Sequence, residues 1–180
     1  MIHLRPATPE DAPLMVDLVD MAGDGLPMAT WSGHAPNDPR AFGIRHALRD
    51  RGGFTWRNAR IAEWDGAVAG MLMCWPLALD PHPLEGLPPL VRPIQSLENL
   101  ARGRLLINAV AVLPAFQRKG IGWMLVQTVT DRAALIVGDG NTPARTLYER
   151  LGFVEVARET VVGDEIWTPP HQNWCLMVRG

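Results

Sequence analysis

Alternating and periodic hydrophobic positions along the chain predict strands and helices in mixed order. The segment RLLINAVAVL, residues 104–113, is apolar nearly throughout and predicts a strand buried on both faces, interrupted by Asn108. The turn pair Asp65-Gly66 within residues 54–79 predicts a hairpin. Further strands are expected at 2–8, 134–140, 154–160 and 173–180.

Helices are expected between these strands. Leu14, Leu18 and Met21 repeat at helical spacing behind the N-cap candidate Thr8, and Gly23 ends that helix. Other helices are expected at 38–50 with Asp38 as N-cap, from Gly120 to about Ala133, at 142–153 with Thr142 as N-cap, and briefly at 94–102. Residues 24–37 are expected to form a loop. This order of elements predicts a mixed α/β (α+β) fold.

Composition narrows the class of protein. The chain has 180 residues, 47% of them hydrophobic, which predicts a single domain over 1–180 with a substantial core. A net charge of −2 argues against nucleic-acid binding driven by bulk charge. No apolar stretch reaches bilayer length and the N-terminus lacks a secretory pattern, so we expect a cytoplasmic protein with no membrane partner. Cys74 and Cys175 are expected to be buried thiols of a reducing compartment.

A proline-rich segment interrupts the pattern at about 80–103. Proline at this density cannot continue a sheet, so the segment is expected to be an insertion or a long loop. The histidines show no ligand spacing with either cysteine, so no metal site is expected.

The stretch QRKGIG, residues 117–122, carries the first sign of chemistry. It follows the buried strand and opens a helix, and Gly120 and Gly122 let the backbone approach a ligand closely. Arg118 and Lys119 are unfavourable at the positive end of a helix, but they suit a bound phosphate. A glycine-rich turn with two solvated cations explains the same residues. The patterns of P-loop kinases and of dinucleotide-binding folds are both absent.

Two motifs together resemble those of the GNAT superfamily of acyl-CoA-dependent N-acetyltransferases. The family hallmark, [RQ]-x-x-G-x-[GA] between a strand and a helix, stands here as Gln117, Gly120 and Gly122. The segment NTPARTLYERLGF, residues 141–153, resembles a second motif of the family. The resemblance implies a mostly antiparallel central sheet with one splayed parallel strand pair, flanked by about four helices.

The resemblance also implies acetyl-CoA as cofactor, lying where the two parallel strands splay apart. In the family's pattern, the strand residues pair with the pantetheine arm, the glycine turn holds the pyrophosphate, and an Asn bonds the pantetheine. The residues implied in cofactor binding are Val110, Ala111, Val112, Gln117, Arg118, Lys119, Gly120, Ile121, Gly122, Asn141, Ala144 and Tyr148. Tyr148 is in addition the implied catalytic acid that protonates the leaving thiolate; packing on an amphipathic helix is its structural alternative.

The acceptor site and the general base are less defined. Trp31 and Asn108 are candidates for the acceptor site, which the segments 24–37, 80–103 and 163–173 would build. Some family members carry a Glu where Asn108 stands, and Asn cannot act as a base. Glu63, His34 and His171 are candidate bases without a spacing argument, so none is assigned. Trp167 and the acids Asp20, Asp24, Asp164 and Glu165 could also serve a cationic amine, or form a solvated rim.

These observations predict an enzyme that moves an acetyl group from acetyl-CoA to a primary amine of a small molecule or peptide. A non-catalytic CoA-binding sensor module is the alternative that Asn108 raises. A protein that prefers NAD or ATP is a third, weaker reading. The final strand could pair across a homodimer.

Overall fold

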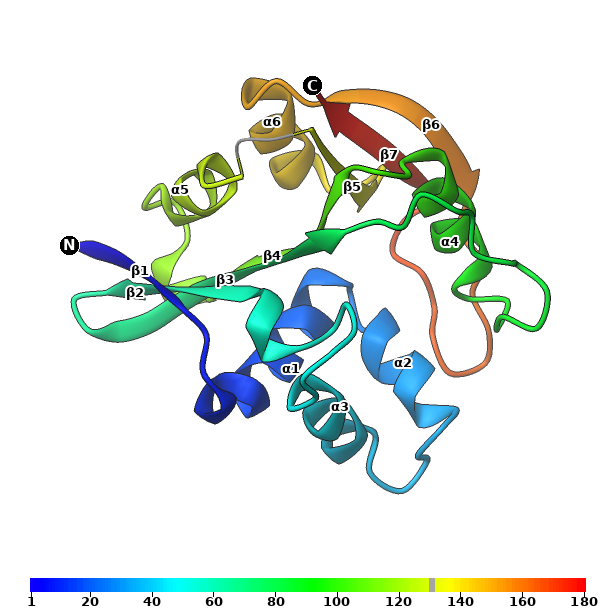
Figure 1. Cartoon of the computed structure of the whole chain (residues 1–180), viewed down its shortest axis with the longest axis horizontal. Helices are drawn as coiled ribbons and strands as arrows, with labels where there is room; N and C mark the ends of the chain where they lie inside the picture. The colour runs from blue at the N-terminus through cyan, green and yellow to red at the C-terminus, as the bar shows by residue number, and fades with distance from the viewer. Residues whose placement is uncertain (130–131) are drawn as a thin grey trace. The chain divides into compact units, whose positions relative to one another are not determined.

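A computed structural model of the protein describes residues 1–129 and 132–180. The chain divides into two compact units, each assembled from two segments (Figure 1). The N-terminal unit comprises residues 1–74 and 109–128, and the C-terminal unit comprises residues 75–108 and 129–180. Strand β4 contributes residues to both units.

The elements of the described residues are the following. The strands are β1 (Ile2–Pro6), β2 (Ala59–Trp64), β3 (Ala67–Pro76), β4 (Leu105–Val112), β5 (Ala133–Gly138), β6 (Val154–Thr160) and β7 (Asn173–Arg179). The α-helices are α1 (Ala12–Ala22), α2 (Leu26–Ser32), α3 (Pro39–Ala47), α4 (Arg92–Leu100), α5 (Ile121–Gln127) and α6 (Thr142–Arg150). Single 3₁₀ turns occupy Pro9–Asp11, Trp56–Asn58 and Pro114–Phe116.

The strands follow the order β1-β2-β3-β4-β5-β7-β6. The pairs β1–β2, β2–β3, β5–β7 and β6–β7 are antiparallel, whereas β4 and β5 are parallel. This confirms the expected mixed α/β fold, with a mostly antiparallel sheet and one parallel pair. The structure has six α-helices in the described residues, where about four were expected.

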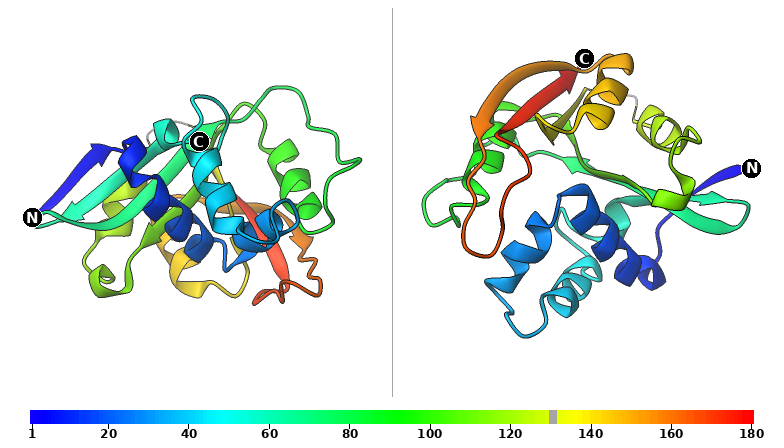
Figure 2. Two further views of the ribbon diagram at one scale, coloured as in Figure 1. Left: turned by 90° about the horizontal axis from the view of Figure 1, so that it is seen from below. Right: turned by 180° about the vertical axis from the view of Figure 1, so that it is seen from behind.

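In the N-terminal unit, the helices α1, α2 and α3 pack on one another (Figure 2). Their buried residues include Met15, Val16 and Leu18, and β2 and β3 bury Ile61 and Met71. Burial of such side chains is the main source of stability of a unit of this kind.

In the C-terminal unit, α4 packs against β6 and β7 (Figure 1). The hydroxyl of Ser96 on α4 donates to the carboxylate of Glu159 on β6 at 2.8 Å. Strand β7 lies between β5 and β6, so both of its edges are paired. The expectation that the final strand could pair across a homodimer is therefore wrong, because β6, not β7, ends the sheet.

The expected loop at 24–37 contains helix α2. Gly25 adopts φ 84° before the helix, Pro27 lies in its first turn, and the Asp20 carboxylate accepts a hydrogen bond from the Met28 N–H at 2.9 Å. Proline fixes a helical φ in a first turn, and the carboxylate satisfies one of the amides that a helix start leaves unpaired. These features stabilise a short helix that hydrophobic periodicity does not reveal.

Three other expectations also differ from the structure. Helix α5 ends at Gln127, not near Ala133. Just after its end, the Thr128 hydroxyl donates a hydrogen bond to the Leu125 carbonyl at 2.7 Å. Residues 130–131 of the expected helix lie outside the described residues. The N-cap of α6 is Asn141, not Thr142, because the Asn141 side chain accepts from the Ala144 N–H. Strand β4 is not buried on both faces, since Asn108 is exposed.

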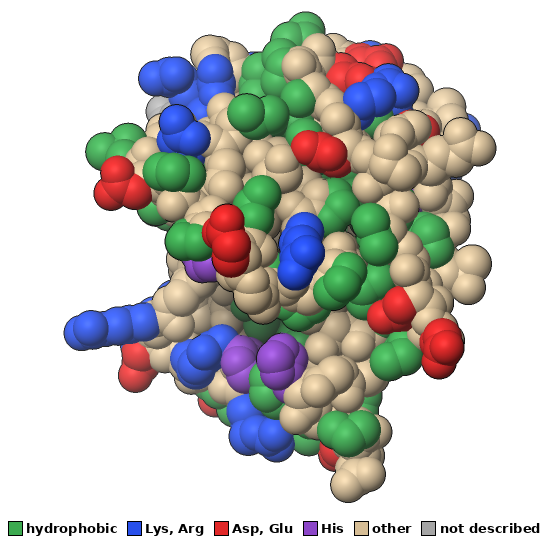
Figure 3. All heavy atoms as spheres, turned by 90° about the vertical axis from the view of Figure 1, so that its right-hand side faces the viewer, with side chains coloured by type: hydrophobic (Ala, Val, Ile, Leu, Met, Phe, Trp, Pro, Cys, Tyr) green, Lys and Arg blue, Asp and Glu red, His purple; other side chains and the backbone are tan. Residues whose placement is uncertain are grey.

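On the face shown in Figure 3, acidic, basic and apolar side chains are intermixed, and neither sign of charge dominates. Among the residues that the structure describes, no helix has the length and apolar character needed to cross a bilayer.

Candidate functional site

The turn between β4 and α5 presents main-chain amides to solvent. Residues 117–120 are exposed, and Arg118 (φ 64°) and Gly120 (φ 80°) adopt the left-handed backbone conformation. For Arg118 this conformation costs roughly 1–2 kcal/mol. In the described part of the chain, no hydrogen bond engages the N–H groups of Arg118, Lys119 or Gly120. Successive amides in such a turn form a concavity that binds anions.

The two cations of this turn are held differently. The Lys119 ammonium lies 4.8 Å from the centroid of the Trp64 ring and 5.3 Å from that of Phe116. Both distances are within the range of a cation–π contact. Arg118 is exposed and forms no salt bridge with any described residue. The turn therefore carries one positioned cation and one that is available to a ligand.

The remaining residues of the predicted pyrophosphate turn are fixed from β4 and α5. The Gln117 amide donates to the Val112 carbonyl at 3.1 Å, which closes the turn onto the end of β4. Ile121 is buried, and Gly122 lies behind it in the first turn of α5. A Cβ atom at Gly120 would have no neighbour within 4 Å, so the space beside this residue is open.

The main-chain groups of alternate residues of strand β4 point toward β3. The Leu113 N–H donates to the Ala69 carbonyl at 2.8 Å, and a Cβ atom at Gly70 would lie 2.5 Å from the Ala111 carbonyl oxygen. Main-chain groups of alternate residues point to opposite edges of a strand, so those of Val110 and Val112 point away from β3. The parallel pairing of β4 with β5 covers Leu105–Ile107 only.

In the C-terminal unit, Asn141 and Ala144 form the start of helix α6. The Asn141 Oδ1 atom accepts from the Ala144 N–H at 3.3 Å, and the Asn141 N–H donates to the Gly138 carbonyl at 3.0 Å. The carbonyl oxygen of the Asn141 side chain is thus used as a helix cap, which leaves its amide N–H groups as donors.

Tyr148 is buried on α6, with only 7% of its surface exposed. Its ring meets that of Phe153 edge to face, with centroids 6.0 Å apart. Burial raises the pKa of Tyr148 to about 12, so the phenol stays protonated at neutral pH. Its hydroxyl forms no hydrogen bond with the described residues, which leaves it able to donate to a ligand.

The predicted acceptor residues occupy different environments. Asn108 is exposed on β4. Trp31 is half-buried and lies over Gly43, where a Cβ atom would be 2.7 Å from its ring, and its ring is 5.4 Å from that of Phe54. Trp167 is buried and stacks on Trp174 at 6.3 Å. Packing thus accounts for much of the surface of both tryptophans.

The candidate bases and acids are largely engaged in the fold. The Arg5 guanidinium donates to Glu63 at 2.7 Å and also pairs with Asp11, whose pKa it lowers. His34 is exposed and stacks on Phe42. Asp164 accepts from two amides of its own loop, at Ile166 and Trp167. His171 packs so closely on the end of β5 that a Cβ atom at Gly138 would be 2.0 Å from its ring.

One titratable group that sequence reasoning missed is Glu98 on α4. Burial raises its pKa to about 7, while His82 and a hydrogen bond from Gln95 lower it. The buried residues of α4 are Pro93 and Leu97, so the apolar pattern of the helix does not mark Glu98 in the sequence. Within the described residues no group of three or more His, Cys, Asp or Glu side chains is arranged to hold a metal ion.

The sequence model of the acetyltransferase (GNAT) family matches residues 24–153. No curated protein matches the chain. Among solved structures, an N-acetyltransferase of Staphylococcus aureus Mu50 matches with a TM-score of 0.70 at 15% identity, covering 98% of this chain and 100% of that one.

Two further solved structures are named for amine substrates. An agmatine N-acetyltransferase matches with a TM-score of 0.68 at 15% identity, covering 99% of this chain and 98% of that one. The ribosomal-protein alanine N-acetyltransferase of Escherichia coli matches with a TM-score of 0.57 at 17% identity, covering 99% of this chain and 92% of that one. At these identities the likeness concerns the fold.

Proposed function

The chain belongs to the acetyltransferase (GNAT) family, and we propose that it transfers an acetyl group from acetyl-CoA to a primary amine of a small molecule or peptide. The observation that carries the proposal is the exposed turn at 117–120. The amides of Arg118, Lys119 and Gly120 have no hydrogen-bond partner in the described residues, and Arg118 and Gly120 adopt the left-handed backbone conformation. Such a strained turn suits an anion such as the pyrophosphate of CoA.

The residues around this turn fit the rest of the cofactor. The Val110 and Val112 main-chain groups that point away from β3 would pair with the amides of the pantetheine arm, as an added strand does. Ala111 lies between them. The Val112 carbonyl already accepts from Gln117, so the Val112 N–H and both Val110 groups would serve. The amides from Arg118 to Gly122, Ile121 included, would hold the pyrophosphate, together with the charges of Arg118 and Lys119.

Asn141, Ala144 and Tyr148 complete the proposed cofactor contacts from helix α6. With Oδ1 of Asn141 used as the helix cap, its side-chain amide would donate to a pantetheine carbonyl. Ala144 adds a half-buried small side chain on the same helix.

Acetyl-CoA, when bound, supplies an acetyl group on a thioester. In the proposed transfer, an N–C bond forms at the acetyl carbon, the C–S bond breaks, and a proton is needed on the leaving sulfur. Tyr148 would donate that proton and regain one from water, because its phenol is neutral at physiological pH. The Val110 N–H is the proposed donor to the carbonyl oxygen.

A CoA-binding sensor without catalysis is the second candidate function. The observation that favours it is the exposed Asn108 on β4, since an amide cannot remove the proton of the attacking amine. In the transferase reading, Asn108 and Trp31 would instead contact the acceptor.

The remaining proposals concern organisation. We propose that the two units form a single N-acetyltransferase domain, supported by the family match, which spans segments of both. We also propose a cytoplasmic location and action on amines without nucleic-acid or membrane partners. A homodimer would pair through β6, which ends the sheet.

Release of free thiol from acetyl-CoA in the presence of an amine panel tests the proposal. The panel would hold polyamines, amino acids and peptides, with buffer alone as the blank. Amine-dependent release that mass spectrometry matches to an acetylated product supports the transferase. Tight CoA binding without transfer to any amine would favour the sensor instead.

A further inference from the structure

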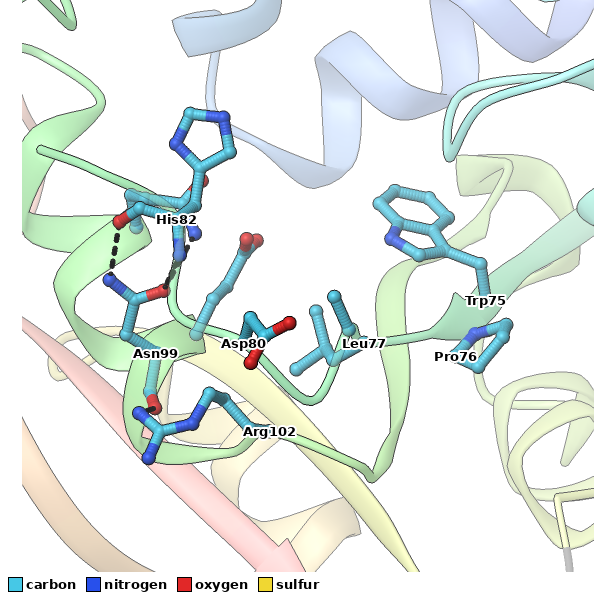
Figure 4. A pocket seen from close by; sticks show the side chains of 10 residues that line it. Trp75, Pro76, Leu77, Asp80, His82, Asn99 and Arg102 are labelled. Atoms are coloured by element: carbon cyan, nitrogen blue, oxygen red, sulfur yellow. Dashed lines mark hydrogen bonds between the residues drawn. The ribbon is translucent and has the colours of Figure 1, made fainter.

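The C-terminal unit contains a cavity of about 170 Å³ between the end of β3 and helix α4. Given a share of about 30 Å³ for a water molecule in the liquid, it has room for a ligand of several heavy atoms. Figure 4 shows Trp75, Pro76 and Leu77 on one side and His82 and Asn99 on the other. Ala78, Asp80, Gln95, Glu98 and Arg102 complete the lining.

The cavity has two carboxylates that take part in no salt bridge with a described residue. Among the described residues, Asp80 and Glu98 form no salt bridge. Arg102 is the one guanidinium of the lining, and it donates to the Asn99 carbonyl at 2.6 Å at the end of α4 (Figure 4). Glu98 is half-buried whereas Asp80 is exposed, so the desolvation argument concerns Glu98: a half-buried carboxylate without an ion pair favours an external cation.

The walls of the cavity are held in place. Asn99 uses both atoms of its side-chain amide on the main chain of His82: Oδ1 accepts from the His82 N–H and Nδ2 donates to the His82 carbonyl, each at 2.9 Å. The His82 Nδ1 atom lies 2.8 Å from the Pro83 carbonyl, to which it can only donate. Helix α4 is tied in turn to β6 through Ser96 and Glu159. A preformed cavity of this kind binds without an ordering cost.

We propose that this cavity binds the primary ammonium group of an unbranched aliphatic amine, with Glu98 and Asp80 as its counter-charges and Glu98 as the group that takes up its proton. The assignment rests on the proposed acetyltransferase function, for which it names the acceptor site. Trp75 and Leu77 provide an apolar wall for the methylene chain, and the Trp75 ring suits a cation as well.

The proton balance is simple. The ammonium gives one proton to the Glu98 carboxylate and becomes a neutral amine, while Glu98 becomes a neutral acid. Once the amide has formed, Glu98 returns its proton to water and the second amine proton is also released to water, while the thiol takes its proton from Tyr148, which regains one from water. A carboxyl whose pKa is raised by burial to about 7 is a better proton acceptor near neutral pH than an ordinary glutamate.

The charged and titratable groups that line the cavity with Glu98 are Asp80 and His82 from the loop before α4 and Arg102 just after α4. Of these, His82 lowers the pKa of Glu98. An ammonium beside Glu98 would lower it further, because an opposite charge favours the ionised carboxylate.

The test is an NMR titration of the full chain with ¹³C-labelled glutamate carboxyls, with and without n-butylamine. The Glu98 resonance is assigned by its loss in Glu98→Gln. We expect its titration midpoint to move to lower pH with n-butylamine and to stay in place with n-butanol, which has the same chain and no charge. A midpoint that n-butylamine does not move would overturn the proposal.

Variants give a second readout that does not depend on one substitution. Glu98→Gln and Asp80→Asn should each weaken n-butylamine binding roughly tenfold or more at pH 8. Glu85→Gln is the matched control, because Glu85 is exposed in the same segment and does not line this cavity. Equal affinity in Asp80→Asn, Glu98→Gln and the control would contradict the site.

Acetyl-CoA binding, measured on the same samples, separates the two proposals. A wild-type chain that binds acetyl-CoA but shows no response of Glu98 to n-butylamine contradicts the acceptor cavity alone. A chain that binds no CoA species contradicts the proposed function, whatever the amine does.

Discussion

The Lys119 ammonium lies over the ring of Trp64, 4.8 Å from its centroid, and so ties the turn after β4 to strand β2. Lys119 is the single lysine of the sequence. The turn that we assign to the pyrophosphate therefore contains an amine that can be followed selectively.

We predict that CoA protects Lys119 from acylation by an N-hydroxysuccinimide ester. A bound pyrophosphate would pair with the ammonium and cover it. Mass spectrometry after limited labelling measures the effect, and the N-terminal amine of Met1 serves as internal control. Equal labelling of Lys119 with and without saturating CoA would remove it from the cofactor site.

Gly120→Glu should abolish acetyl-CoA binding while the fold is retained. The space beside Gly120 is open, so the substitution adds a negative charge at the anion site without a clash. Gly120→Ala is the matched control: it carries the same backbone strain at φ 80°, roughly 1–2 kcal/mol, without the charge. Calorimetry should show binding that is weaker by far in the Glu variant than in the Ala variant. Similar affinities in both would argue against an anion at this turn.

Tyr148→Phe should lower turnover at least tenfold and change acetyl-CoA affinity little. The ring keeps its packing on Phe153, and only the proton donor is lost; general acid catalysis is typically worth about 10²–10⁴. Since burial raises the pKa of Tyr148 to about 12, ionisation of its phenol should not limit the wild-type rate at pH 9. Full turnover in the variant would exclude Tyr148 as the acid.

Gly138→Ala should destabilise the protein by about 1–3 kcal/mol. The added Cβ would lie 2.0 Å from the His171 ring, and overpacking of this kind has that cost. In a His171→Ala background the same change should cost much less, which a double-mutant cycle in urea measures. A cost that is identical in both backgrounds would show that the ring is not the obstacle.

Glu98 should make stability fall as pH rises from about 4.5 to about 7. Burial raises the pKa of Glu98 in the folded state from its ordinary value of 4.5 to about 7, so the folded state binds the proton more tightly than the unfolded state in this window. Glu98→Gln should therefore gain stability relative to wild type as pH rises through the window, and the difference should level off above pH 7. A difference that does not vary with pH would mean that Glu98 titrates normally.

Much of this fold can be predicted from the sequence, because its strands and turns leave local signals such as apolar runs and turn residues. The hairpin at Asp65-Gly66 and the strand at 104–113 appear where the pattern predicts them, within a few residues. Helix α2 was missed because it depends on the Asp20 carboxylate and on Gly25, neither of which is a hydrophobic repeat.

Caps and pockets are harder to predict from sequence. Thr142 and Asn141 are both good N-caps, and only the geometry of the Ala144 N–H selects Asn141. The environment of Glu98 depends on a loop folding back on α4 through Asn99 and His82, which no single segment encodes. The turn at 117–122 can be singled out from the sequence because it is one local segment, whereas the cavity beside Glu98 is assembled from separate segments.

Thermal unfolding with acetyl-CoA, CoA, NAD or ATP added separately shows whether the protein binds CoA in preference to other nucleotides. A ligand at a hundredfold its dissociation constant adds about 2.7 kcal/mol, and each kcal/mol is worth roughly 2–4 °C for a domain of this size. We predict a rise of several degrees with acetyl-CoA and CoA only. No rise with either, or a rise only with NAD or ATP, would contradict the acyltransferase assignment.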